Sequence, residues 1–128
     1  MTPLILEWIS KAEGDFQTAT RELRARKNPN YDAVCYHAQQ CAEKYLKTLL
    51  QVADIPFGKT HNLIGLLQLL LPVHPMLEAM RPQLDYLNAF ASQIRYPGES
   101  ADKATAQQAM KHCGLIRSEV RSILPLDL

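Results

Sequence analysis

The stretch YDAVCYHAQQCAEKYLKTLLQVA, residues 31–53, decides the fold, because it combines helical periodicity with unbroken length. At 100° per residue its apolar side chains project to one side and its polar side chains to the other. Leu46 and Leu50 widen the apolar stripe, which predicts the central helix of a bundle with two or three neighbours. The apolar side holds Val34, Ala38, Cys41, Ala42, Tyr45, Leu49 and Val52, and the polar side holds Tyr36, Gln40, Glu43 and Lys47.

Apolar residues spaced by three and four predict further helices on both sides of this stretch. No segment alternates with period two, so we expect an all-α protein: one domain over residues 1–128, an antiparallel up-and-down helical bundle of four long helices plus one short helix. Pro82 allows the fourth helix to begin near Arg81 instead. The predicted ranges are 3–27 with Thr2 as N-cap, 31–53, a short helix capped by Thr60 and ending at Leu71, 76–94, and 101–124.

The composition limits the possible functions. Fourteen Lys and Arg against 13 Asp and Glu give no general basic field, so nucleic-acid binding requires a local cluster. One such cluster, Arg21, Arg24, Arg26 and Lys27, falls at the end of the first helix, where the helix dipole accounts for it better than a phosphate site. Three cysteines without CxxC spacing predict free thiols, and the lack of a long apolar run predicts a soluble cytoplasmic protein without membrane contact.

The central helix carries two groups of candidate residues. His37 and Cys41 lie on neighbouring turns and, with His61, have the donor types of a metal site, but Cys41 falls in the apolar stripe, so we expect no metal. The polar side is either a solvated face with a Glu43–Lys47 pair or the wall of a cleft. If it is the wall of a cleft, we expect Lys44 and His37, at the border of the polar side, to contact an anionic ligand.

The segment Arg95-Tyr96-Pro97-Gly98 is the other candidate site, because Pro97 ends the preceding helix and restricts Tyr96. A guanidinium and an aromatic ring held at a helix end suit phosphate and base contacts. The alternative is a plain helix terminus at which Arg95 caps carbonyl groups.

Four segments together resemble the HEPN domain family of bacteria and archaea, all-α domains related to the C-terminal domain of kanamycin-type nucleotidyltransferases. They are WISKAEGDFQTA (8–19), HAQQCAEKYLKTLL (37–50), KTHNLIGLL (59–67) and RYPG (95–98). The resemblance implies a bundle that dimerises and that is often encoded beside a small nucleotidyltransferase as a toxin–antitoxin-like pair. It also implies, for many members, a metal-independent ribonuclease site in which four to six residues separate an arginine from a histidine that follows it.

This chain departs from that motif, since Ser100, Ala101 and Asp102 stand where the histidine belongs after Arg95. RNA cleavage by this route needs a group that moves protons near neutral pH. We therefore predict a cofactor-free, homodimeric nucleotide- or RNA-binding partner of a nucleotidyltransferase. Its dimer cleft is expected near Arg95 and Tyr96. The alternatives are a ribonuclease with a variant site at these two residues and a purely structural dimerisation module. The wall of the cleft is expected to be His37, Gln40 and Lys44.

Overall fold

The computed structural model describes residues 1–92 and 96–126, and within these ranges it contains helices and connections but no strand. The all-α prediction is confirmed. The elements in chain order are α1 (Pro3–Leu23), α2 (Tyr31–Val52), α3 (Leu63–Leu70), the 3-10 helix η1 (Pro75–Met80), α4 (Arg81–Asn88) and α5 (Lys103–Ile123).

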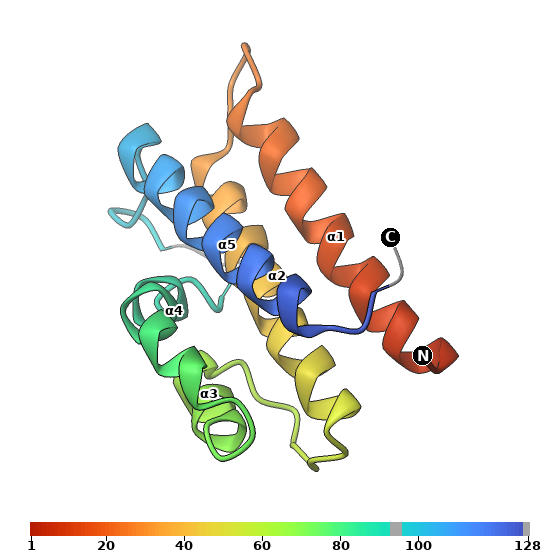
Figure 1. Cartoon of the computed structure of the whole chain (residues 1–128). Helices are drawn as coiled ribbons and strands as arrows, with labels where there is room; N and C mark the ends of the chain where they lie inside the picture. The colour runs from red at the N-terminus through yellow and green to blue at the C-terminus, as the bar shows by residue number, and fades with distance from the viewer. Residues whose placement is uncertain (93–95, 127–128) are drawn as a thin grey trace.

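Three long helices form the core, with α2 between α1 and α5 (Figure 1). The helices α1 and α2 are antiparallel, because Trp8 near the start of α1 lies 5.9 Å from the ammonium of Lys47 near the end of α2. The helix α5 runs in the same direction as α2: Ala101, just before α5, contacts Asp32, and Arg121 near its end contacts Tyr45.

Nearly all of α2 is buried, which confirms its central position. Its apolar residues pack against α1 and α5 and also against α3 and α4. The wide apolar stripe therefore contacts more helices than the two or three that the sequence predicted. Removing this much apolar surface from water is the main stabilising contribution to such a bundle. The largest fully buried side chains of α2 are Tyr45, Leu46, Leu49 and Leu50.

The return segment between α2 and α5 differs from the prediction of one long helix over residues 76–94. The chain first forms η1 from Pro75 and then α4 from Arg81, and α4 ends at Asn88. Pro82 lies in the first turn of α4, where the missing N–H of proline costs no hydrogen bond, so the alternative start at Arg81 is correct. The first helix is also shorter than predicted and ends at Leu23 instead of residue 27.

Polar side chains accept hydrogen bonds from the first backbone N–H groups of four of the five described α-helices, namely α1, α2, α3 and α5, whereas α4 has no such cap. The cap of α3 is Asn62 and not Thr60, whose hydroxyl instead accepts a hydrogen bond from the Asn62 backbone N–H at 3.1 Å. No helix in the described part of the chain has the length and apolar content needed to cross a membrane. The caps are Thr2, Asn30, Asn62 and Asp102.

Candidate functional site

The described part of the RYPG motif, Tyr96-Pro97-Gly98, forms a tight turn with Glu99 in the connection to α5. The Glu99 backbone N–H donates to the Tyr96 carbonyl at 2.9 Å, and Gly98 has φ of 89°, a conformation that strains any residue with a Cβ. The turn leaves the Tyr96 side chain 68% exposed. Arg95 lies outside the described residues, so its role remains a prediction.

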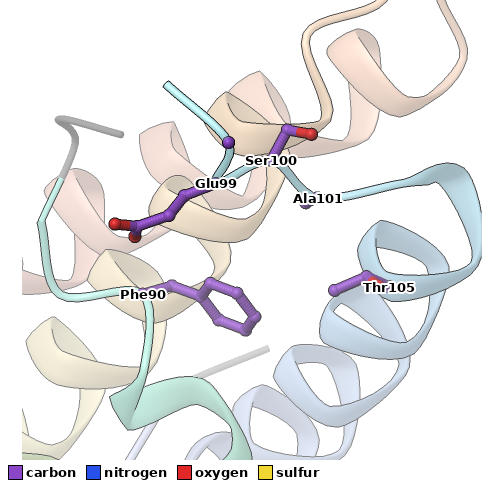
Figure 2. Close-up of a pocket in the computed structure, with 6 residues that line it drawn as sticks. Phe90, Glu99, Ser100, Ala101 and Thr105 are labelled. Carbon is purple, nitrogen blue, oxygen red and sulfur yellow. The ribbon is translucent and has the colours of Figure 1, made fainter. Parts of the chain in front are cut away.

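A cavity of about 310 Å³ opens beside this turn and is lined by Phe90, Gly98, Glu99, Ser100, Ala101 and Thr105. Figure 2 shows the Phe90 ring directed into the space between the segment 99–101 on one side and Thr105 of α5 on the other. Residues from the end of the α4 segment, from the loop before α5 and from α5 itself therefore line one opening. Its volume lies at the lower end of the range of small-molecule sites, roughly 300–1,000 Å³.

Hydrogen bonds fix the walls of the cavity. The Asp32 carboxylate of α2 accepts from the Ala101 backbone N–H at 2.7 Å, which holds the lining segment against the start of α2. On the other side, the Tyr86 hydroxyl donates to the Thr105 carbonyl at 3.1 Å, and its ring packs against Phe90 with centroids 5.7 Å apart. These contacts hold the walls of the cavity against α2, α4 and α5.

The described residues that line the cavity include no histidine, the side chain whose usual pKa lies nearest neutral pH. Asp102, at the last of the positions where the family histidine is expected, is the N-cap of α5. The Thr105 backbone N–H holds the pKa of Asp102 below its usual value, so this carboxylate stays ionised. The next histidine, His112, packs edge-on against the Tyr86 ring, and burial lowers its pKa.

The structure brings two other predicted site residues together through a residue that the sequence analysis did not single out. Asp15 of α1 is buried and accepts hydrogen bonds from His37 Nδ1, at 2.8 Å, and from the Lys44 ammonium. Within the described residues, no hydrogen bond or ion pair joins His37 or Lys44 to Tyr96. The common cleft wall of these residues with Tyr96 therefore stays a prediction. The signal in the sequence for the Asp15 cluster was an aspartate next to the apolar stripe of the first helix.

The polar side of α2 is not a solvated face. Glu43 and Lys47 form the predicted pair at 3.1 Å, but both are buried, and His61 Nδ1 covers Glu43 at 2.9 Å. Gln40 is also buried and donates to Gln39 Oε1 at 2.7 Å. The loop after α2 explains this burial, because it places Phe57 over Lys47 opposite Trp8.

The three side chains considered as metal ligands contact other residues. His37 contacts Asp15, His61 contacts Glu43, and Cys41 is buried next to Cys113. The hydrogen bond with Cys113 and burial hold the pKa of the Cys41 thiol well above its usual range. Among residues 1–92 and 96–126 there is no group of three or more His, Cys, Asp or Glu side chains arranged to hold a metal ion.

Comparisons with known proteins agree with the fold. A profile of the HEPN domain matches residues 5–123. The structure is similar to that of an archaeal HEPN homologue, with a TM-score of 0.75 and 21% identity, covering 96% of this chain and 98% of that one. It is also similar to a protein from Thermus thermophilus, with a TM-score of 0.79 and 23% identity, covering 96% of this chain and 100% of that one. No curated protein sequence matches this chain.

The fold therefore defines an all-α domain with a cavity at the connection before its last helix. The chain belongs to the HEPN domain family, since the family profile spans almost its whole length.

Proposed function

We propose that this protein is a non-hydrolytic HEPN domain that binds a nucleotide at the cavity beside Tyr96. One observation carries the proposal: a cavity of about 310 Å³ adjoins an exposed tyrosine directly after Arg95, the family's functional arginine position. Arg95 is the proposed phosphate contact, because a guanidinium matches phosphate geometry with two parallel hydrogen bonds.

The lining of the cavity suits a nucleobase better than a phosphate. Phe90 offers an aromatic ring, and base–aromatic stacking contributes roughly 1–3 kcal/mol per base. The Glu99 carboxylate accepts hydrogen bonds from the N–H groups of a base edge and repels phosphate. The proposed arrangement places the base in the cavity and its phosphate outside, on the side of Tyr96 and Arg95.

Binding without cleavage is favoured by the replacement of the histidine. Ser100 lines the cavity, the Ala101 N–H is held by Asp32, and Asp102 stays ionised as a helix cap. None of these three positions holds a histidine, the side chain that most often transfers protons near neutral pH. The ribonuclease alternative needs Tyr96 to take that role, and it is tested below.

We further propose that the protein is a homodimer and pairs with a small nucleotidyltransferase in a toxin–antitoxin-like system. Large apolar side chains near the end of α3 and the start of η1 support a protein interface: Leu69 is 40%, Val73 50% and Met76 54% exposed. Sedimentation of the purified protein tests the dimer, and co-purification of the product of a neighbouring nucleotidyltransferase gene tests the pair. A monomer that captures no such protein contradicts this part of the proposal.

Calorimetric titration with adenosine and guanosine monophosphates tests the binding function. Arg95→Ala and Tyr96→Ala are each expected to weaken binding at least tenfold, whereas Arg81→Ala, a half-buried arginine of α4 outside the cavity lining, leaves it unchanged. Unchanged affinity in both site variants rules out the assigned site.

Incubation with labelled transfer RNA tests the ribonuclease alternative. The non-hydrolytic proposal predicts either no cleavage or the same trace cleavage in wild type, Arg95→Ala and Tyr96→Phe, as a contaminant would give. Cleavage by the wild type that both substitutions abolish establishes the ribonuclease instead.

A further inference from the structure

The α1–α2 cavity is a further opening in the surface, apart from the cavity before α5. It has a volume of about 210 Å³ and lies between the N-terminal half of α1 and the C-terminal half of α2. None of its lining residues also lines the cavity before α5. They are Leu4, Glu7, Trp8 and Lys11 of α1 and Lys44 of α2.

Two apolar side chains of α1 lie next to each other in this lining. Leu4 and Trp8 are four residues apart and are therefore neighbours on one face of the helix. Leu4 is 52% exposed, whereas the half-buried Trp8 ring packs edge-on against Phe57 of the loop after α2, with ring centroids 6.2 Å apart. The aromatic wall is thus held in place, and an apolar ligand in the cavity would remove the exposed surface of Leu4 from water.

Three charged side chains surround this apolar pair. Glu7 and Lys11 are exposed, and neither side chain forms a hydrogen bond or an ion pair with another described residue. Lys44 is half-buried, and its ammonium donates to the Asp15 carboxylate, which fixes its position. An ammonium has three N–H donors, so Lys44 keeps donors for a ligand. The α1–α2 cavity therefore offers one carboxylate and two ammonium groups.

The spacing of these charges matches one class of small molecule. Glu7 and Lys11 are also four residues apart on α1, so their Cβ atoms are separated by roughly 5–6 Å. Two such side chains can contact opposite charges on either side of a single carbon atom, which is how an α-amino acid carries its ammonium and its carboxylate. The volume of about 210 Å³ lies below the roughly 300–1,000 Å³ of sites for drug-sized molecules, so the ligand is small.

We propose that the α1–α2 cavity binds a free α-amino acid with an apolar side chain. Lys11 and Lys44 hold its carboxylate, Glu7 holds its ammonium, and Leu4 and Trp8 contact its side chain. Each charge of the ligand then lies beside an opposite charge, and its apolar part leaves water. The inference goes beyond the proposed nucleotide function and does not depend on it, because the two cavities share no lining residue.

Ligands with only one of the two charges match the α1–α2 cavity less well. An apolar carboxylate without an ammonium group leaves Glu7 unpaired and next to a like charge. An apolar amine lies beside Lys11 and Lys44, whose ammonium groups repel it. A comparison of leucine with analogues that each lack one of its groups therefore tests each part of the assignment.

The experiment uses the fluorescence of Trp8, which lines the α1–α2 cavity and is the single tryptophan of the chain. The wild type is titrated with L-leucine and with three analogues. These are 4-methylpentanoate, which lacks the ammonium, 3-methylbutylamine, which lacks the carboxylate, and glycine, which lacks the apolar side chain. L-Leucine is expected to change the emission of Trp8 until it saturates. The two analogues with one charge are expected to bind at least about fivefold more weakly, and glycine at least about tenfold more weakly.

Two variants test the charges of the protein. Glu7→Gln and Lys11→Met are each expected to weaken leucine binding by about two- to fivefold, the upper part of the range for an exposed ion pair. The matched controls are Asp85→Asn and Lys111→Met, which remove one exposed charge of the same sign outside both cavities and should leave the affinity unchanged. Thermal unfolding checks that all four variants fold as the wild type does.

The proposal is overturned if L-leucine up to about 20 mM leaves the Trp8 emission unchanged, or if both test variants bind leucine as the controls do. Binding of 4-methylpentanoate or 3-methylbutylamine as tightly as leucine would also overturn it, since one of the two charges would then have no partner in the cavity. Equal affinity for glycine would show that Leu4 and Trp8 do not contact the ligand, which again contradicts the assignment. Tyr96→Ala should bind leucine as the wild type does, so a failure of the nucleotide site is distinguished from a failure of this one.

Discussion

The carboxylate of Asp32 accepts a hydrogen bond from the backbone N–H of Ala101 at 2.7 Å, across 69 residues of sequence. This contact fixes the wall of the cavity to the central helix. Asp32→Ala is expected to lower the free energy of unfolding by roughly 1.5–3 kcal/mol, the usual range for a hydrogen bond to a charged group, and to weaken nucleotide binding. Asp32→Asn, which keeps an acceptor oxygen, should retain most of both. Urea unfolding and calorimetry measure the two effects, and equal behaviour of both variants contradicts this role.

A second prediction concerns Glu13, which joins all three long helices. Its carboxylate accepts from Arg117 Nε at 2.7 Å, from Arg117 Nη2 at 2.6 Å and from the Tyr45 hydroxyl at 2.5 Å. The Arg117 hydrogen bond holds the pKa of Glu13 below its usual value. A depressed folded-state pKa stabilises the protein above the unfolded pKa, and this contribution is lost as the pH falls below about 4.5.

The wild type should therefore lose stability more steeply than Glu13→Gln as the pH falls below about 4.5. At neutral pH, Glu13→Gln should be less stable by roughly 1–3 kcal/mol, because Arg117 loses its charged partner. Thermal unfolding across this pH range provides the measurement. Parallel curves for the two proteins would show that Glu13 does not have the proposed linkage.

The buried pair Glu43–Lys47 gives a third prediction. Removing one member of a buried ion pair leaves an uncompensated charge and costs roughly 3–5 kcal/mol. Lys47→Met should therefore be strongly destabilised, and Glu43→Gln/Lys47→Met should recover most of the loss. Guanidinium unfolding of both single variants and the double variant measures the coupling. If the stability losses of the two single variants add up in the double variant, the two charges are not energetically coupled.

A fourth prediction concerns the thiols. Cys35, Cys41 and Cys113 are fully buried, and the hydrogen bond between Cys41 and Cys113 together with burial raises the pKa of Cys41. Iodoacetamide at pH 8 should label none of the three in the native protein and all three after unfolding. Labelling of a single cysteine under native conditions would indicate local opening around that residue.

Helical periodicity predicted the central helix to within one residue at its C-terminal end, because residues 31–53 carry one continuous amphipathic pattern. The return segment was mispredicted because its apolar spacing continues through Phe90 although the helix ends at Asn88. Propensity and spacing do not reveal where tertiary packing ends a helix. The burial of Glu43 and Lys47 was missed for a similar reason, since the covering residues Trp8 and Phe57 are distant in sequence.

For the candidate site, the sequence pointed to the segment beside the cavity but not to the shape of the cavity. Tyr96 was identified from Pro97 and Gly98, which restrict the backbone locally. Phe90, Ser100 and Thr105 come together around the cavity only through the folding of α4 against α5, so no local pattern marks them. Asp15 was missed because its partners, His37 and Lys44, lie on another helix.

The central claim is that the cavity beside Tyr96 holds the base of a nucleotide, and filling the cavity tests it most directly. Ala101→Leu adds apolar volume at the cavity wall without removing a charge or the backbone contact to Asp32. Ala104→Leu, an exposed alanine of α5 outside the lining, is the matched control. Calorimetric titration with guanosine monophosphate should show binding to the wild type and to Ala104→Leu, and at least tenfold weaker binding to Ala101→Leu at unchanged thermal stability. Equal affinity in all three proteins would contradict the account.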